Sequence, residues 1–466
     1  MTNNLPLNWC ECKFEDVLDY EQPTRYIVSN TDYQEQGIAV LTAGKSFILG
    51  YTDEKDGIFD ASKETVIIFD DFTTASKLVD FPFKVKSSAM KILHAKKDIN
   101  INFLYYLMQT IHYESDTHKR YWISEYAKQT LNLPPLAEQE RIVAKIEALF
   151  QGIDEGVERL KSAQAQIKQY RQSVLKSAFE GKLYKKNNNE NEVQKLSSEI
   201  EKEAQYLIKS KQIQKAKEIY PFDVNHHPIN IPDSWIWRRL YDVAFITKLA
   251  GFEYTKYIKL TENGEVPTIR AQNVRKYTLD ETNLMYIDLK TSKFLERSAL
   301  TKPAILITFI GAGIGDVALF DRKKRYHLAP NVAKVELFNS LSYKISEKYI
   351  LYYLNSPIGQ QELFKYMKAT AQPSLSMGTI RDIYFPLCSL PEQQRIVEEI
   401  EKRFAVADVL EKAVNEGLEK ADKLKQSILK KAFEGKLAPQ NPNDEPASVL
   451  LDRIKKEQKP TKGKKK

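Results

Sequence analysis

The chain has 466 residues, 42% hydrophobic content and a formal net charge of +8. This length allows about three domains with apolar cores, because domains usually contain about 100 to 200 residues. The composition excludes a chain that is disordered as a whole. The positive charge permits a polyanionic partner but does not require one.

The first residues, from Met1 to Leu7, contain no basic segment followed by an apolar one. No later apolar run reaches the ~18 residues that span a bilayer, so we expect a cytoplasmic protein. Three cysteines cannot build a disulfide framework, and Cys10 and Cys12 have no second ligand pair for structural zinc. We expect reduced thiols and no metal site.

Residues 1–132 are predicted to form a first globular domain. This domain has 14 Lys and Arg residues against 19 Asp and Glu residues, a net charge of −5. Binding to a polyanion would therefore depend on a local basic patch. The candidate patch consists of Lys84, Lys86, Lys91, Lys96 and Lys97.

Two short motifs of this domain are interpreted as turns. Residues Gly44–Ser46 resemble the end of a phosphate-binding loop, but Ala39 replaces the required glycine and Phe47–Tyr51 has the composition of a strand. Asp70–Asp71 beside Lys77 could hold Mg²⁺ against a phosphate. An isolated acidic pair at a turn is usually solvated, so we predict a surface turn.

Residues 133–183 are predicted to be helical, followed by a linker at 184–230 that contains a short helix. The spacing of Ile142, Ile146 and Phe150 marks one helix face. A second, longer helix of roughly 27 residues, about 40 Å long, is expected to end at Gly181, which is suited to a C-cap.

Residues 231–386 are predicted to form a second globular domain with 22 basic and 15 acidic residues, a net charge of +7. Its segment Phe309–Asp316 resembles the glycine loop that holds S-adenosylmethionine in methyltransferases. Val317–Phe320 continues as a strand, and no segment suited to a flipped adenine follows. We interpret Phe309–Asp316 as a hairpin turn.

Residues 387–437 repeat the first helical segment, and residues 438–466 contain a short helix and a lysine-rich tail. The block that starts at Glu138 returns at Glu392, an offset of 254, and ten of the twelve residues from Gln172 match those from Gln426. Unrelated segments would match at roughly one position in fifteen. The two helical segments are therefore copies of each other.

The two globular domains also share short sequence motifs, called echoes below. A Pro-x-x-Trp pattern occurs at Pro6 and at Pro232, an offset of 226, and a Leu-Tyr-Tyr-Leu stretch starts at Leu104 and Leu351. These echoes predict one fold for both domains. The repeated apolar stripes predict that the helical copies pack as an antiparallel coiled coil. The expected 40 Å rod would place two DNA contacts about one turn, ~34 Å, apart.

This doubled pattern resembles the specificity subunit of type I restriction-modification systems, over essentially the whole chain. The resembling motifs are a Leu-x-Glu-Gln-x-Arg-Ile-Val block that opens each helical segment, preceded by Pro135 in the first copy, and a Ser-x-Leu-x-x-Ala-Phe-x-Gly-x-Leu block near its end. The resemblance implies an α+β protein in which two target recognition domains of mixed structure alternate with two repeated long-helix segments. It also implies a non-catalytic subunit that binds double-stranded DNA.

The same resemblance implies the partners. These are two modification (methyltransferase) subunits and, through them, restriction subunits, for adenine methylation or DNA cleavage. S-adenosylmethionine, ATP and Mg²⁺ would belong to the partners, and this chain would bind no cofactor. The residues that we expect to dock these subunits come from the repeated blocks: Glu138, Gln139, Arg141, Phe150, Phe179, Glu392, Gln393, Arg395, Phe404 and Phe433.

Candidate DNA contacts are polar residues of predicted loops, since Arg pairs with guanine and Asn or Gln with adenine in the major groove. In the first domain they are Thr42, Lys45, Ser46, Tyr51, Thr73, Thr74 and Lys77. In the second they are Arg270, Gln272, Asn273, Arg275, Lys276, Tyr326, His327, Asn331, Gln372 and Ser374.

Two other functions remain open. A coiled-coil scaffold that binds proteins through its globular ends would show no DNA binding, or binding that is insensitive to salt. A self-sufficient methyltransferase would bind its cofactor as an isolated chain. The six histidines show neither metal spacing nor a nucleophile partner.

Overall fold

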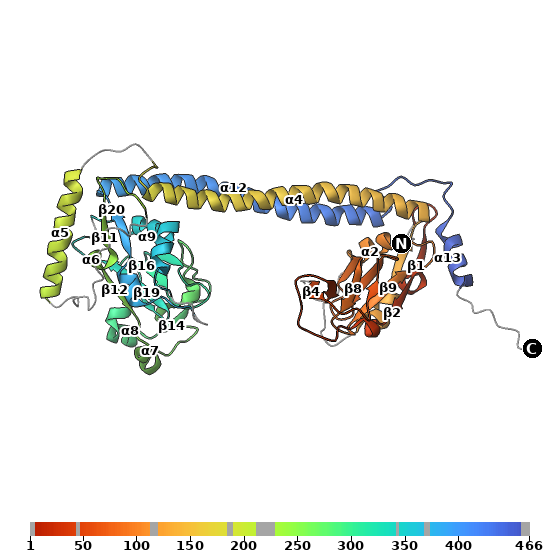
Figure 1. Ribbon diagram of the computed structural model, residues 1–466, viewed down its shortest axis with the longest axis horizontal. Helices are drawn as coiled ribbons and strands as arrows, with labels where there is room; N and C mark the ends of the chain where they lie inside the picture. The colour runs from red at the N-terminus through yellow and green to blue at the C-terminus, as the bar shows by residue number, and fades with distance from the viewer. Residues whose placement is uncertain are drawn as a thin grey trace, which may run out of the picture. The chain divides into compact units, whose positions relative to one another are not determined.

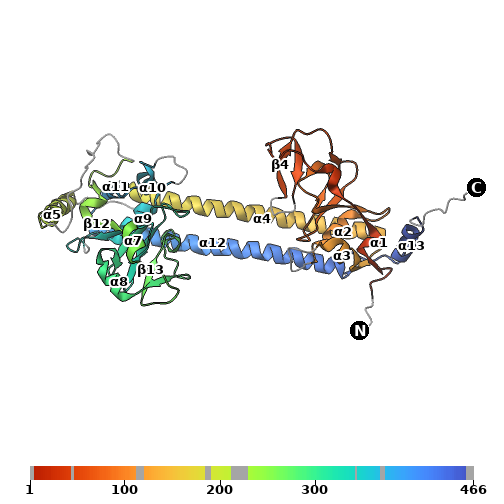
Figure 2. The ribbon, with the colours of Figure 1, turned by 90° about the horizontal axis from the view of Figure 1, so that it is seen from below.

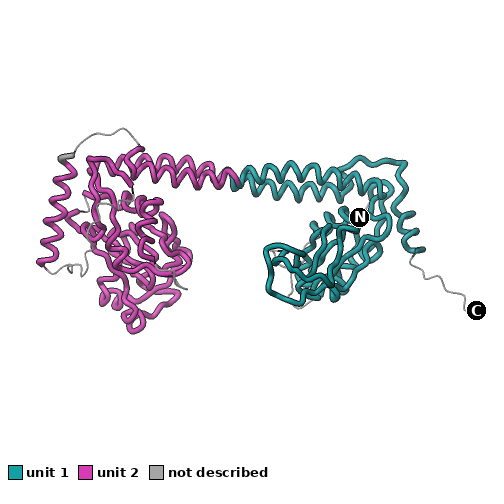
Figure 3. The backbone as a smooth tube through the Cα atoms, in the orientation of Figure 1, with its two compact units in different colours: residues 1–161, 414–466 teal, residues 162–413 magenta. Residues whose placement is uncertain are grey.

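The computed structural model describes residues 5–42, 47–111, 120–183, 190–210, 229–341, 344–367 and 373–457. It divides into two compact units (Figure 3), unit 1 with residues 1–161 and 414–466, and unit 2 with residues 162–413. Each unit therefore combines one globular domain with parts of both long helices.

The first domain contains two four-stranded sheets and a two-stranded one. The strand orders are β2-β9-β6-β7, β4-β3-β8-β5 and β1-β10. The strands are β1 (Cys10–Lys13), β2 (Leu18–Glu21), β3 (Ile38–Leu41), β4 (Ile48–Thr52), β5 (Phe59–Asp60), β6 (Val66–Asp70), β7 (Ser76–Val79), β8 (Pro82–Val85), β9 (Met90–Ala95) and β10 (Thr130–Leu133). All neighbours pair antiparallel except β3 and β8.

The second domain repeats this topology strand for strand. Its orders are β12-β19-β16-β17, β14-β13-β18-β15 and β11-β20, and its one parallel pair is β13 with β18. The strands are β11 (Ile236–Arg239), β12 (Ala244–Lys248), β13 (Val266–Ile269), β14 (Met285–Ile287), β15 (Ala299–Leu300), β16 (Ala304–Thr308), β17 (Val317–Phe320), β18 (Tyr326–Leu328), β19 (Val332–Leu337) and β20 (Tyr384–Leu387). The prediction of one shared fold is confirmed.

Short helices fill the connections of both domains. In unit 1 they are α1 (Phe14–Val17), η1 (Pro23–Tyr26), α2 (Ile101–Met108), α3 (Tyr121–Ser124) and η2 (Tyr126–Lys128). In unit 2 they are α6 (Leu240–Val243), α7 (Gly251–Tyr257), η3 (Ala271–Asn273), α8 (Leu289–Phe294), η4 (Glu296–Ser298), α9 (Glu347–Asn355), α10 (Pro357–Phe364) and α11 (Met377–Arg381). The two Leu-Tyr-Tyr-Leu echoes lie in α2 and α9.

Each helical copy forms one continuous helix of 44 residues, α4 (Leu136–Phe179) and α12 (Leu390–Phe433). The prediction of two successive helices in each copy is wrong, because Gly152 and Gly156 lie within α4 without breaking it. A helix of this length measures about 66 Å. The expected separation of two DNA contacts by about one turn was based on a 40 Å rod, so it no longer follows.

The two long helices run antiparallel, side by side (Figures 1 and 2). In unit 1, Lys425 of α12 forms an ion pair with Asp154 of α4 at 2.5 Å. In unit 2, Arg171 of α4 lies 2.6 Å from Asp408 and 2.8 Å from Glu411 of α12. The predicted antiparallel packing is confirmed within each unit.

A further helix follows each long one, as the repeat predicts. These are α5 (Glu190–Lys209) in unit 2 and α13 (Ala447–Glu457) in unit 1. The matched pairs Leu196 with Leu450 and Ile200 with Ile454 are all buried in the core of their own unit.

Candidate nucleic-acid interface

A buried glutamine joins each globular domain to the start of a long helix. The Gln139 side chain accepts a hydrogen bond from the backbone N–H of Asn100, the N-cap of α2, at 2.9 Å. Gln393 accepts one from the backbone N–H of Ser346, the N-cap of α9, also at 2.9 Å. Both side chains are fully buried, and both also donate to a carbonyl just before their own helix.

A glycine and a proline join each domain to the end of the other long helix. Gly181 and Gly435 both have φ +69°, the left-handed conformation of a helix C-cap. A Cβ at Gly181 would lie 2.3 Å from Cγ of Pro232, and one at Gly435 would lie 2.6 Å from Cγ of Pro6. The repeated Pro-x-x-Trp pattern therefore packs directly against the repeated helix end.

These contacts explain most of the residues predicted to dock partner subunits. Six of them are buried in their own unit: Glu138, Gln139, Phe179, Glu392, Gln393 and Phe404. Phe150 and Phe433 are half-buried. These side chains make intramolecular contacts, so the repeated residues have a structural role. The prediction that the six buried ones dock partner subunits on the surface is therefore wrong.

The arginines of the two repeated blocks differ. Arg141 contacts Asp444 at 2.5 Å inside unit 1, whereas Arg395 is exposed. Burial raises the pKa of Glu138, and the nearby Trp9 indole and Arg141 oppose that rise. Docking through Arg395 stays a prediction.

The candidate contacts of the first domain lie in two hairpin turns. Thr42 closes the β3–β4 turn by donating its backbone N–H to Phe47 O at 2.8 Å, and Tyr51 is half-buried on β4. This antiparallel hairpin excludes the strand-to-helix geometry of a phosphate-binding loop. Lys45 and Ser46 lie outside the described residues.

The second turn joins β6 to β7. Thr73 and Lys77 are exposed there, and Thr74 adopts φ +58°. Asp70 accepts hydrogen bonds from the turn, including one from the backbone N–H of Phe72 at 3.0 Å. Thr73 and Lys77 therefore remain available at a sheet edge.

The acidic pair beside this turn is not a solvated surface feature, and that prediction is wrong. Asp70 and Asp71 are only 2% and 1% exposed. Asp71 forms a fully buried ion pair with Lys91 at 3.1 Å and accepts the backbone N–H of Trp122 at 2.8 Å. The ion pair links the end of β6 to β9, and the hydrogen bond from Trp122 links it to α3.

The lysine patch predicted for the first domain is also wrong. Lys91 is buried, and Lys84 is 3% exposed and contacts Glu54 at 2.6 Å. Lys96 donates to a backbone carbonyl at 2.7 Å, and Lys97 faces Glu457 at 3.6 Å. Four of the five lysines therefore contact internal partners, which sequence position alone did not reveal, whereas Lys86 is exposed.

In the second domain, the segment after β13 divides into structural and exposed residues. Asn273 is 2% exposed, accepts the backbone N–H of Arg270 and donates to a carbonyl across the loop, so its assignment as a base contact is wrong. Arg270 donates to Asn283 O at 2.6 Å. Gln272, Arg275 and Lys276 are exposed.

The exposed cations of this segment lie beside the glycine turn. The segment Gly311–Asp316 joins the antiparallel strands β16 and β17, which confirms the predicted hairpin. Burial raises the pKa of Asp316, and Lys276 and Arg275 oppose this rise through their positive charges. Ser374 is exposed and bridges to Ile310 just before the turn.

Tyr326 and His327 are structural, and their assignment as DNA contacts is wrong. Tyr326 is 8% exposed and donates its hydroxyl to Glu281 at 2.7 Å. His327 is fully buried, with its ring nitrogens 2.8 and 3.3 Å from two backbone carbonyls, and burial lowers its pKa. Asn331 is half-buried in a turn with φ +71°. Gln372 lies outside the described residues.

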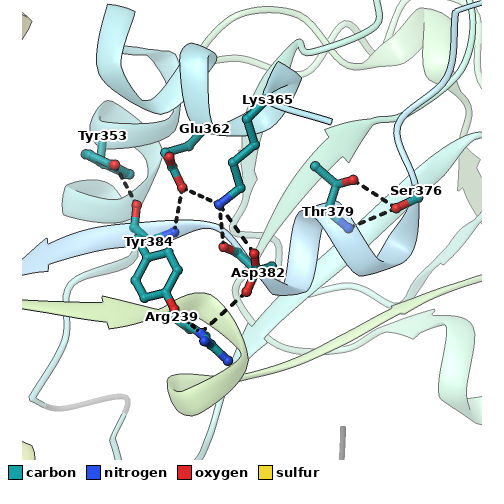
Figure 4. Close-up of polar contacts among 8 residues, drawn as sticks. All are labelled: Arg239, Tyr353, Glu362, Lys365, Ser376, Thr379, Asp382 and Tyr384. Atoms are coloured by element: carbon teal, nitrogen blue, oxygen red, sulfur yellow. Dashed lines mark hydrogen bonds and ion pairs between the residues drawn. The ribbon is translucent and has the colours of Figure 1, made fainter. Parts of the chain in front are cut away.

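A network of charges that sequence analysis missed holds the base of the second domain (Figure 4). Lys365 lies 2.8 Å from Glu362 and 3.5 Å from Asp382, while Arg239 lies 3.4 Å from Asp382. The Arg239 guanidinium also stacks on the ring of Tyr384 at 5.0 Å. Arg239 of β11 and Lys365 next to α10 are far apart in the sequence, and both contact acidic partners within the domain.

Among the residues with described positions, no group of His, Cys, Asp and Glu could hold a metal ion. Within the part of the chain that the structure describes, no helix has the length and apolar character needed to cross a membrane. The exposed groups that remain are cations, amides and hydroxyls on hairpin turns of both domains. Such groups suit phosphates and base edges.

Comparison with known proteins agrees with this arrangement. The family profile for the type I restriction modification DNA specificity domain matches residues 6–162 and 232–420, which together make up most of the chain. The chain belongs to this family. Both matched segments begin at the Pro-x-x-Trp pattern and include one globular domain with the first part of the following long helix.

Individual proteins that are similar to this chain are described as specificity subunits of type I restriction enzymes. The specificity subunit of the type I restriction enzyme EcoR124I/EcoR124II from Escherichia coli is 42% identical over 172 residues, 34% of this chain and 43% of that protein. The EcoBI specificity subunit, also from Escherichia coli, is 29% identical over 344 residues, 72% of this chain and 66% of that protein. The matches thus span less than two thirds of either relative.

A solved structure shares the fold. It comes from a study described as the structural basis underlying complex assembly and conformational transition of the type I R-M system. The likeness covers 93% of this chain and 100% of that chain, with a TM-score of 0.55 and 18% sequence identity. The α+β fold with two recognition domains and paired long helices is thereby confirmed.

Proposed function

We propose that this chain recognises a bipartite DNA target, with one globular domain for each half. The observation that carries the proposal is the pair of topologically identical domains, each joined to the long helices by the same glutamine and glycine contacts. The two domains differ in their connections. The β3–β4 connection has six residues, 42–47, whereas the β13–β14 connection has fifteen, 270–284.

The two long helices would fix the separation of the two contacts. Both have 44 residues, so the duplication preserved their length while the domains diverged. Ion pairs at Asp154 and Arg171 hold their antiparallel register in each unit. A fixed separation would select targets whose halves lie a set number of base pairs apart.

The partners would be two modification subunits and restriction subunits that dock on the helices. Adenine N6 methylation or DNA cleavage would then take place on those partners, which would hold S-adenosylmethionine, ATP and Mg²⁺. Exposed residues of the helices, such as Arg395, are the available docking surface. The alternative is a protein scaffold that does not bind DNA.

Salt titration of DNA binding separates the two functions. We expect the full chain to bind a fluorescent duplex with an affinity that falls steeply with salt. The double variant Arg275→Gln and Lys276→Gln should lower the slope of log K against log salt by about one per cation that contacts a phosphate. The readout is fluorescence anisotropy over a series of salt concentrations.

The matched control replaces Lys402 and Lys412 with Gln, because both are exposed on α12 within the same unit. This control removes two positive charges and should keep the slope of the unmodified chain. Binding that is insensitive to salt, or no binding at all, would favour the scaffold.

A further inference from the structure

An exposed aromatic surface lies on two short helices of the second domain. Phe252 of α7 is 71% exposed and Phe294 of α8 is 66% exposed, and they are the exposed phenylalanines of the described residues. Tyr257, 36% exposed, meets Phe294 edge to face with ring centroids 5.0 Å apart. Leaving such rings in water is unfavourable, and clustered exposed apolar groups mark binding sites.

The two helices contact the rest of the domain. Arg297 of η4 contacts Glu253 of α7 at 2.9 Å. Asp288 caps α8 by accepting the backbone N–H of Thr291 at 2.7 Å. Tyr254, on the same helix as Phe252, packs against the apolar core of the domain.

Four exposed lysines lie on or next to the same two helices. Lys256 and Lys259 lie in and just after α7, and Lys290 and Lys293 lie on α8. Among the described residues, no carboxylate is within ion-pair distance of any of them, unlike Arg297 and Arg325 nearby. The surface therefore combines exposed positive charge with apolar rings.

This surface is separate from the exposed turn after β13. The α8 helix follows β14, whose end Ile287 pairs with Val266 at the start of β13, and Thr261 just after α7 bridges to Tyr286. The segment 270–276 follows the opposite end of β13. Figure 1 shows α7 and α8 together at the end of the second domain remote from α12.

We propose that the surface formed by Phe252, Tyr257, Phe294 and the four lysines is a second contact with duplex DNA, beside the half-target of this domain. The inference rests on the proposed function. The lysines neutralise phosphates, and the rings act as apolar wedges against a base step, as in proteins that deform DNA. Protein interfaces are instead depleted in lysine.

Among its described residues, the first domain has no helix that takes the place of α8. Its β4–β5 connection, residues 53–58, contains no helix, whereas α8 occupies the matching connection of the second domain. The additional contact therefore extends the footprint on one side of the bipartite target only.

Two independent variants of the full chain test this surface with the same fluorescent duplex. The first replaces Lys256, Lys259, Lys290 and Lys293 with Gln, and should lower the salt slope by about three to four. The second, Phe252→Ala with Phe294→Ala, should weaken binding about tenfold without changing the slope. Both sets of side chains are exposed, and thermal unfolding checks that the variants fold.

The outcomes are distinguishable. If both variants bind like the unmodified chain while Arg275→Gln with Lys276→Gln still weakens binding, this surface is not a DNA contact and the proposed function stands. If the variants instead lose a co-expressed modification subunit at unchanged DNA affinity, the surface belongs to a protein partner. If the unmodified chain binds no duplex, the proposed function fails as well.

Discussion

Replacement of Gly181 with alanine is expected to destabilise unit 2 by about 2 to 4 kcal/mol. The new Cβ would lie 2.3 Å from Cγ of Pro232, and φ +69° is costly for any residue with a side chain. Urea unfolding followed by tryptophan fluorescence measures the loss, and Trp235, 3.7 Å from the same position, contributes to that signal. Gly435→Ala should act likewise in unit 1.

The matched control is Gly156→Ala in the interior of α4. A Cβ there would meet nothing within 4 Å, so this substitution should stabilise by about 0.5 to 1 kcal/mol through the helix propensity of alanine. If Gly181→Ala left the unfolding midpoint unchanged, the packing of the helix end against Pro232 would not hold the domain.

Replacement of Lys91 with methionine is expected to destabilise the first domain by about 3 to 5 kcal/mol. The change leaves the Asp71 carboxylate buried without its cation, and both side chains are 1% exposed. Urea unfolding of the full chain, followed by tryptophan fluorescence to which Trp122 beside Asp71 contributes, measures the loss.

The double variant Lys91→Met with Asp71→Asn should recover part of this stability, because the amide oxygen can still accept the backbone N–H of Trp122. As a control, Lys77→Met changes an exposed lysine of the same sheet and should alter stability by less than about 0.5 kcal/mol. Equal effects at Lys91 and Lys77 would show that the buried pair contributes nothing.

The architecture could be predicted from the sequence because duplication is visible at the level of residues. The matched blocks predicted two copies of a helical segment and one fold for both domains, and the strand orders agree. The helix length was predicted too short, because the apolar residues up to Phe150 and those toward Gly181 were assigned to two separate helices, whereas α4 is continuous from Leu136 to Phe179.

The candidate site was predicted only in part, because residue type does not reveal burial. Asn273 and His327 have side chains suited to DNA contacts, yet each satisfies backbone groups inside the domain. Their partners are set by tertiary folding. Arg275 and Lys276, on a turn beside the glycine hairpin, stayed exposed as predicted.

Sequence analysis fails in the opposite way for Phe252 and Phe294, because these apolar residues are exposed. Apolar residues of a helix are usually counted toward the core, so the sequence offered no reason to treat these two as a surface. Their exposure follows from the short helices α7 and α8, which bury other faces against the domain. Only the three-dimensional structure shows that both side chains are exposed on helices that also carry exposed lysines.

The most direct test of bipartite recognition is single-molecule sequencing of DNA for N6-methyladenine in cells that express this chain with its modification subunit. The control cells lack only this chain. We predict methylation at one motif made of two specified halves with a fixed number of unspecified base pairs between them, absent from the control. Identical methylation in both cell populations would contradict the account.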